Sequence, residues 1–227
     1  PLNPPDEYEH AEMVMDILRR MPANVAVMRV QTDSEDTERI APRWTMSKGQ
    51  FLEFLERQME LREFCQGDLT DRPRAIPQTT TFRVETTADG SPTFWNAACG
   101  EHYHAPPGAL SEARTKYVRA SRLSERLRER DIRLLDVCFG LGYNSLAAVE
   151  AALAAPCSLH ICALESDRRV VRAAAEAIDS DILPEVPWAA ILARLHQRGE
   201  VPFANVAIRM MWGDARYSVR RLRDEAG

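Results

Sequence analysis

The sequence lacks the features of a membrane or secreted protein. Its 227 residues contain no run of about 18 apolar residues, the length at which a membrane-spanning helix becomes a candidate. The first residues, Pro1 to Asp6, lack the basic and then apolar order of a signal peptide. With 45% hydrophobic and 28% charged residues, the composition is that of a globular protein. We therefore expect a cytoplasmic protein.

Cysteine is scarce, and its spacing is irregular. An odd number of thiols without a CxxC or CxxxCxxC pattern predicts neither a disulfide framework nor a metal cluster. We expect free thiols in a reducing compartment, no metal site and no iron–sulfur cluster in this chain. The five cysteines are Cys65, Cys99, Cys138, Cys157 and Cys162.

The chain also lacks an excess of positive charge. Its formal net charge is −5, whereas general nucleic-acid binders usually carry a basic balance that releases counterions from phosphates. A local basic face is compatible with this total. Two segments are candidates for such a face. In the first, the basic residues alternate with Glu112, Glu125 and Glu129, which favours an ordinary solvated helix face there. The candidates are Arg114, Lys116, Arg119, Arg122, Arg126 and Arg128, and then Arg216, Arg220, Arg221 and Arg223.

The first 67 residues predict a helix, a strand and a second helix. Apolar residues at helical spacing indicate an amphipathic helix over 5–20, β-branched residues a strand over 25–31, and a second helix follows over 47–64. A strand needs neighbours to bury both its faces, and the chain supplies none before it. Residue 1 is Pro, and no closing element follows Asp224. We therefore expect the chain to be cut at both ends.

A polar, proline-punctuated stretch separates this unit from the rest, which gives domains at 1–67 and 81–227 joined by a linker at 68–80. Residues 81–86 and 92–96 alternate around the turn signal Asp89-Gly90-Ser91 and predict a β-hairpin. A helix over 111–130 comes next. Strands at 133–137, 158–164 and 206–212 then alternate with helices at 144–154, 168–178 and 188–198. This order predicts an α/β fold with a parallel, doubly wound sheet.

The segment from Asp136 to Asn144 is the most informative motif. A strand ends in Asp136, and Gly140 and Gly142 follow before a helix, so that a nucleoside-bearing ligand can lie against backbone. The dinucleotide fingerprint needs a third glycine where Ser145 stands. The motif therefore favours S-adenosylmethionine over NAD, with a plain strand-to-helix turn as the alternative.

Two further carboxylates follow the next two strands. Glu165 ends the second strand, where it can accept hydrogen bonds from ribose hydroxyls, or it can cap a helix as Ser166 or Asp167 could. Asp214 can receive an adenine amino group, with a helix N-cap as its alternative. Asp136 would hold the cationic amino group of the methionine moiety. The three together are more specific than any one alone.

At these positions the chain resembles the methyltransferase domain of the MnmC type, which methylates the aminomethyl group on the wobble uridine of certain transfer RNAs. The resemblance covers roughly 81–227 and rests on residues 86–93, 100–104, 108–113, 138–144 and 213–216. It implies a class I S-adenosylmethionine-dependent methyltransferase with a Rossmann-like sheet, and transfer RNA as its partner. The implied cofactor contacts are Asp136, Cys138, Gly140, Gly142, Tyr143, Asn144, Glu165, Asp214 and Ala215, with Tyr103, His104 and Glu112 at the pocket mouth.

The family also has a fourth strand that ends in an acidic, phenylalanine-rich motif and reaches the substrate amine. Nothing in residues 217–227 matches it. The resemblance therefore implies that the catalytic residues lie beyond Gly227 and that this chain is the front part of the enzyme. Cys138 replaces a glycine that many such enzymes carry, which implies a tolerated small side chain and not a nucleophile.

The first domain resembles another family, the final part of a YhcC-like radical S-adenosylmethionine protein. That family's CxxxCxxC run would lie upstream, so the piece is expected to be a barrel remnant without its chemistry. The radical group is linked to the same wobble-uridine side chain, which implies two consecutive activities in the parent. The matching stretches are 6–8, 18–22, 27–30, 40–44, Lys48 and 66–67.

Two other functions stay open. The chain can be a catalytically silent cofactor-binding or interaction fragment, or an NAD-dependent oxidoreductase. Binding of S-adenosylmethionine, of NAD, or of neither separates the three hypotheses.

Overall fold

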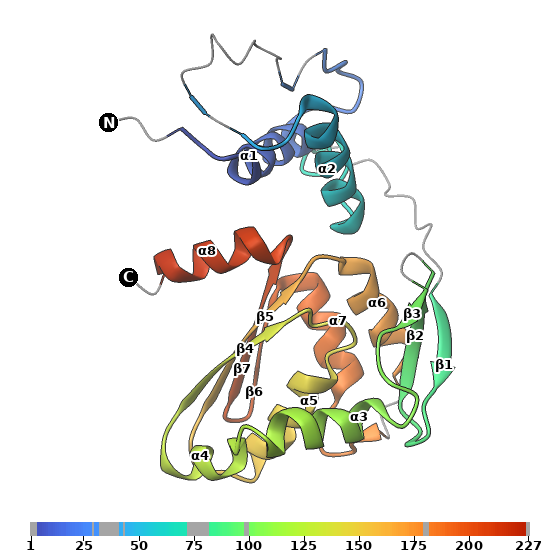
Figure 1. Cartoon of the computed structure of the whole chain (residues 1–227), viewed down its shortest axis with the longest axis vertical. Coiled ribbons are helices and arrows are strands. Elements are labelled where there is room, and N and C mark those ends of the chain that lie inside the picture. Colours follow the sequence, from blue (N-terminus) through green and yellow to red (C-terminus); the bar gives the residue numbers. More distant parts are fainter. Residues whose placement is uncertain are drawn as a thin grey trace. The chain divides into compact units, whose positions relative to one another are not determined.

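The computed structural model describes residues 4–28, 30–31, 41–42, 44–71, 82–97, 100–178 and 182–225. The chain divides into two compact units, residues 1–79 with 219–227 and residues 80–218 (Figure 1). Some residues of the sequence motifs lie outside the described ranges, as do the side chains of Arg221 and Arg223. These residues are Arg29, Ile40, Arg43, Thr81, Cys99 and most of the linker, 72–80.

Two helices, α1 (Glu7–Arg20) and α2 (Lys48–Leu61), form the first unit and confirm the two predicted helices. Each begins with a capping box, in which Asp6 bonds reciprocally with Glu9 and Ser47 with Gln50. Their apolar faces meet in a small core of Ala11, Val14, Met15, Phe51 and Leu55. No helix in the described ranges is both long and apolar enough to cross a membrane.

The predicted strand over 25–31 is wrong for the residues described there. Residues 25–28 and 30–31 are not in strand conformation. The described part of this unit offers no second strand, so the hydrogen-bond ladder that defines a strand cannot form. A β-branched stretch of sequence does not become a strand without a partner.

A three-stranded antiparallel sheet opens the second unit, with β1 (Arg83–Thr86), β2 (Pro92–Asn96) and β3 (Glu101–His102) in that order. It confirms the predicted hairpin. In the turn, Asp89 accepts hydrogen bonds from Ser91 and from the backbone N–H of Ser111, at 2.9 Å, in helix α3 (Ala109–Glu112). Burial opposes the charge of Asp89, but these hydrogen bonds lower its pKa. The ionised turn therefore anchors the helix to the hairpin.

The single helix expected over 111–130 is divided. After α3 come a π-helix, η1 (Ala113–Arg119), and helix α4 (Leu123–Glu129). Arg122 separates the last two in a left-handed conformation with φ of 54°. The break brings Leu123 and Leu127 into the core. Short π-helical segments are frequent at functional sites.

The main sheet has the order β4-β5-β7-β6. Strands β4 (Ile132–Val137), β5 (Leu159–Glu165) and β7 (Val206–Trp212) are parallel, which confirms the predicted α/β class. Strand β6 (Glu200–Phe203) is antiparallel to β7 and was not predicted, because it is short and contains Pro202, which suits an edge strand.

Three helices lie on one side of this sheet: α5 (Tyr143–Leu153), α6 (Arg168–Ala177) and α7 (Trp188–Arg198) (Figure 1). A last helix, α8 (Ala215–Glu225), follows β7. On β4 the alternate residues Leu135 and Val137 are 49% and 46% exposed. Among the described residues the sheet is therefore not covered along β4 as a doubly wound sheet would be.

The turn between β6 and β7 is tied to the end of α5 by one side chain. The amide nitrogen of Asn205 donates to the carbonyl oxygens of Ala152 at 2.9 Å, Ala155 at 3.2 Å and Cys157 at 2.8 Å. Carbonyls past the end of a helix have no partner within the helix. Asn205 supplies a donor to Ala155 and Cys157, adds one to Ala152, which also accepts the N–H of Ala155, and fixes the α5–β5 connection against the sheet.

We expect Asn205→Ala to lower the free energy of unfolding by about 1–3 kcal/mol, because carbonyls that the fold shields from water lose their donor. Urea denaturation of the purified chain measures this. Gln197→Ala, an exposed change on α7, should stay within about 0.5 kcal/mol of the parent chain. Equal midpoints for the two variants would contradict the role of Asn205.

Candidate cofactor site

The loop between β4 and α5 makes a sharp turn at the carboxyl end of the sheet. Its backbone takes positive φ angles at Cys138 (62°), Gly140 (58°) and Gly142 (79°). Left-handed backbone is easy for glycine and uncommon for other residues. The motif therefore places glycine at two of the three positions where the turn requires positive φ. At the third, Cys138 is held in a conformation that residues with a side chain disfavour.

The two glycines lack a side chain for different reasons. A Cβ at Gly142 would lie 2.5 Å from Cζ of Phe139 and 2.8 Å from Cζ2 of Trp188, both in the protein core. A Cβ at Gly140 would lie 3.3 Å from Cδ1 of Tyr103, whose ring covers this part of the turn. Gly142 is required by internal packing, whereas Gly140 lies under a residue of the pocket.

Tyr143, which the resemblance assigns to the cofactor, has a fully buried side chain. Its hydroxyl donates to the carbonyl oxygen of Pro92 at 2.8 Å, and its ring meets the ring of His104 edge to face at 5.0 Å. Burial raises its pKa. The Tyr143 side chain therefore links helix α5 to the hairpin.

Glu165, at the end of β5, holds the loop in place. Its carboxylate accepts hydrogen bonds from the backbone N–H groups of Gly140 at 2.7 Å, Ser166 at 2.8 Å and Asp167 at 2.9 Å. The residue is 8% exposed, and burial raises its pKa. Asp167 is the residue that caps α6. The predicted ribose acceptor thus also fixes the backbone of the cofactor loop.

Asp136, near the end of β4, is 5% exposed. Its Oδ2 accepts a hydrogen bond from the Ser145 hydroxyl at 2.6 Å, and the Asn144 side chain also bonds to it. Burial raises its pKa. Ser145 stands where a dinucleotide fingerprint has glycine, and here its hydroxyl has a defined partner. No cation neutralises Asp136 among the described residues.

Asp214 follows β7 and accepts from the backbone N–H of Arg216 at 2.9 Å, as a helix N-cap does. It also pairs with the Arg216 guanidinium at 2.6 Å. Ala215 is the first residue of α8. The N–H of Gly213 donates to the carbonyl oxygen of Glu165 at 2.9 Å. The ends of β5 and β7 are therefore joined, and Asp214 takes the capping role that was its alternative.

Two cavities adjoin the loop. The smaller, of about 300 Å³, combines the loop with the predicted pocket mouth, and the larger, of about 630 Å³, runs along β4. Gly142, Tyr143, Glu165, Asp214 and Ala215 line neither cavity. The smaller cavity is lined by Tyr103, His104, Glu112, Cys138, Gly140 and Asn144, among others. The larger includes Lys116, Leu135, Asp136 and Asn144.

Tyr117 lines both cavities, together with Val137 and Asn144. Tyr117 was not among the predicted site residues. The available signal was an aromatic residue between Lys116 and Arg119, but a regular helix would have given no reason to place it at the pocket.

The smaller cavity holds a neutral imidazole beside a carboxylate. Burial lowers the pKa of His104, although the charges of Glu112 and Asp89 oppose this, and its Nδ1 has no hydrogen-bond partner among the described residues. Lys116 pairs with Glu112 at 2.5 Å and lowers the Glu112 pKa. The pocket mouth is thus polar.

The Cys138 thiol is exposed. The protein shields one side of the thiol from water, and this loss of hydration, together with the charges of Glu165 and Asp136, raises the pKa of Cys138. The nucleophile in thiol chemistry is the thiolate. These surroundings are consistent with the expectation that Cys138 is not a nucleophile.

The residues at this edge of the sheet fit a cofactor that carries a cation. A buried carboxylate without a partner cation is costly, and an ammonium group beside Asp136 would offset that cost. In the ranges that the structure describes, His, Cys, Asp and Glu side chains do not gather in the number that a metal site needs.

Known proteins share parts of this chain. Residues 1–61 match the Radical_SAM C-terminal domain. The fold is similar to that of MNMC2 from Aquifex aeolicus, with a TM-score of 0.51 and 24% identity over 78% of this chain and 53% of that chain. The chain thus spans about half the length of MNMC2. No curated protein matches. The radical S-adenosylmethionine resemblance of the first domain is confirmed as far as the Radical_SAM C-terminal domain, and the resemblance of the second domain as far as its fold.

We expect Asp136→Asn to raise the midpoint of thermal unfolding of the ligand-free chain, and the gain to be larger at pH 8 than at pH 4. The folded-state pKa of Asp136 is raised, so its contribution to stability is present below the unfolded pKa and is lost as pH rises through the folded pKa. Calorimetric scans at pH 4, 6 and 8 measure the gain, at about 2–4 °C per kcal/mol.

The matched control is Asp131→Asn, an exposed carboxylate just before β4. This change also removes one carboxylate charge, but at an exposed position where the Asn oxygen can still accept the N–H of Ser158, so we expect it to move the unfolding midpoint less than Asp136→Asn does. If Asp136→Asn loses stability relative to the parent chain as pH rises, Asp136 is not a buried, uncompensated carboxylate.

Proposed function

We propose that the chain is part of an S-adenosylmethionine-dependent N-methyltransferase that acts on the aminomethyl group of the transfer RNA wobble uridine. The observation that carries the proposal is the buried, uncompensated carboxylate of Asp136 beside the glycine turn. S-Adenosylmethionine carries an ammonium and a sulfonium, and such charges suit this position. The fold likeness to MNMC2 supports the same proposal.

Asp136 would bind the ammonium group of the methionine moiety. Glu165 would bind ribose through Oε2, which accepts one hydrogen bond, from the N–H of Gly140, whereas Oε1 accepts from Ser166 and Asp167. Asp214 would receive the adenine amino group through an oxygen that also serves Arg216. Gly142, Tyr143 and Ala215 would contribute through backbone alone.

When bound, the cofactor supplies an electrophilic methyl group, and the protein must hold an uncharged amine in line with it. Tyr103, His104 and Glu112 line the cavity next to the loop. A neutral His104 can accept a hydrogen bond from the amine, and Glu112 favours the approach of its cationic form. We assign the removal of the proton to no residue of this chain.

The proposed organisation follows the same boundaries as the sequence. Residues 1–67 would be the end of a radical S-adenosylmethionine domain without its cluster, 68–80 a linker, and 81–227 the cofactor-binding part of a cytoplasmic methyltransferase. The match of residues 1–61 supports the first assignment. One module of the parent would then prepare the amine and the other would methylate it.

A catalytically silent fragment is the second candidate, and the partners of two carboxylates favour it. Glu165 is bonded to backbone, and Asp214 is engaged by Arg216. If these contacts persist in solution, neither side chain is available to a ligand. Binding measurements separate the two candidates.

Isothermal titration calorimetry of the chain with S-adenosylhomocysteine and with NAD is the test. We expect binding of S-adenosylhomocysteine, and at least a tenfold loss in Asp136→Ala and in Glu165→Ala, about 1.4 kcal/mol. Asp131→Ala, an exposed change before β4, is the matched control and should bind like the parent chain. Circular dichroism confirms that each variant is folded.

Three outcomes would contradict the proposal. Selective binding of NAD would favour an oxidoreductase. No binding of either compound would favour the silent fragment. Unchanged affinity in both Asp136→Ala and Glu165→Ala would remove the site assignment.

A further inference from the structure

Residues 114–133 carry a net positive charge, although the chain as a whole is net negative. Eight Arg and Lys residues occur there with three Asp and Glu residues, in a chain whose net charge is −5. Arg114 pairs with Glu150, and Lys116 pairs with Glu112. The remaining six cations are exposed and form no ion pair within the part of the chain that the structure describes: Arg119, Arg122, Arg126, Arg128, Arg130 and Arg133.

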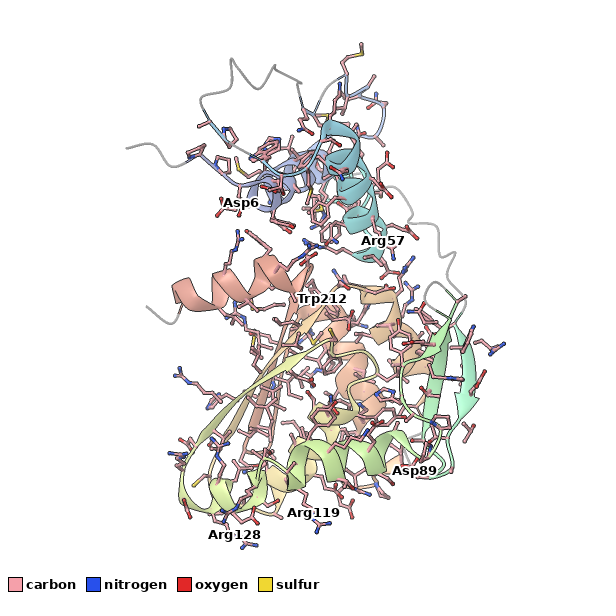
Figure 2. All side chains as sticks on the ribbon, in the orientation of Figure 1. Asp6, Arg57, Asp89, Arg119, Arg128 and Trp212 are labelled. Carbon is pink, nitrogen blue, oxygen red and sulfur yellow. The ribbon has the colours of Figure 1, made fainter. Side chains whose placement is uncertain are left out.

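Four of these residues form a row, which we call the arginine ridge: Arg119, Arg122, Arg126 and Arg130. The backbone N–H of Arg126 donates to the carbonyl oxygen of Arg122, and that of Arg130 to the carbonyl oxygen of Arg126. These three backbone positions are therefore about one helical turn apart, ~5.4 Å. Arg122 and Arg130 flank α4, the first in left-handed and the second in extended conformation. Figure 2 labels Arg119 and Arg128, whose side chains project outward from this segment.

The charge pattern of the ridge differs from the opposite-charge pairs of a typical solvated helix face. Such a face gains stability from opposite charges three or four residues apart, whereas like charges four residues apart destabilise a helix. Glu125 and Glu129 lie in the same helix, yet they form no ion pair with the ridge in the described structure. An external polyanion would relieve the repulsion among these arginines.

Tyr117, in the π-helix η1, lies just before the ridge. Its ring is 53% exposed and makes no aromatic contact within the described ranges. It lines both cavities beside the cofactor loop, together with Val137 and Asn144. Single-stranded nucleic acids are bound by surfaces of this kind, in which an aromatic ring stacks on a base and cations track the backbone.

We propose that Tyr117 and the arginine ridge form the RNA-binding surface of this unit. An unpaired base stacks on Tyr117 at the opening of the cavities, and the phosphates of the adjoining nucleotides lie along the ridge. The inference rests on the proposed function, because it presents a nucleotide to the loop of Asp136 and Gly140. It adds the surface on which that nucleotide is held.

The test is fluorescence anisotropy with a labelled stem–loop RNA that has an unpaired loop, titrated with the whole chain between 50 and 200 mM salt, about the range over which phosphate contacts weaken strongly. The ridge variant carries Arg119→Gln, Arg126→Gln and Arg130→Gln. Arg122 is kept because its left-handed backbone would complicate the result. The control carries the same change at three other exposed arginines, Arg57, Arg194 and Arg198.

We expect the ridge variant to bind the RNA roughly 10- to 100-fold more weakly at low salt, with the slope of log K against log salt reduced by about 2–3, or 0.7–0.9 for each phosphate contact. The control variant should keep both values. Tyr117→Leu should weaken binding about tenfold through lost stacking and leave the salt slope unchanged. Thermal unfolding of each variant shows that it is folded.

The affinity for S-adenosylhomocysteine, measured on the same variants, separates the two proposals. If it is normal and the ridge and control variants lose RNA binding equally, the surface assignment fails and the proposed function stands. If RNA binds the ridge as expected and S-adenosylhomocysteine does not bind the parent chain, the proposed function fails. Absence of RNA binding by the parent chain, or tighter binding to phosphatidylserine vesicles than to RNA, overturns the RNA surface.

Discussion

The cofactor loop depends on one buried carboxylate. Glu165 accepts the N–H of Gly140 from the loop after β4 and two N–H groups at its own strand end, while its carbonyl oxygen receives the N–H of Gly213 after β7. The ends of three parallel strands are thereby held in one arrangement. Without this carboxylate, the left-handed turn at Cys138 and Gly140 would lose its bond at Gly140 and would still be held to β5 by the N–H of Phe139, which donates to the carbonyl oxygen of Leu164 at 3.0 Å.

The positions of some site residues could be predicted because they depend only on the order of strands and helices along the chain. Parallel strands bring their carboxyl ends to one edge, so the positions of Asp136 and Glu165 followed from the alternation of strands and helices. The role of Gly142 could not be predicted, because it depends on Trp188, which is distant in sequence. The strand expected over 25–31 failed because a strand depends on its partners.

The functional surface was harder to predict than the loop. Tyr117 reaches both cavities from a π-helix, whose geometry follows from no simple period in the sequence. Likewise, the basic segment was expected to be a solvated helix face, since Glu125 and Glu129 interleave with its arginines. The structure shows these arginines exposed, as a solvated face would be, and the proposal that they bind RNA goes beyond that expectation. The loop proposed to bind a cofactor and the surface proposed to present a nucleotide to it both include residues that line the two cavities, Asn144 and Tyr117.

The central claim is that the loop at Cys138 binds an adenosyl cofactor, and the exposed Cys138 thiol can report it directly. The rate of alkylation by iodoacetamide at alkaline pH, which supplies thiolate despite the raised pKa of Cys138, is followed by mass spectrometry at Cys138, with the thiol of Cys65 in the first unit as the internal control. The account predicts that S-adenosylhomocysteine slows alkylation at Cys138 and not at Cys65, and that NAD protects neither. Equal rates at Cys138 with and without S-adenosylhomocysteine would contradict it.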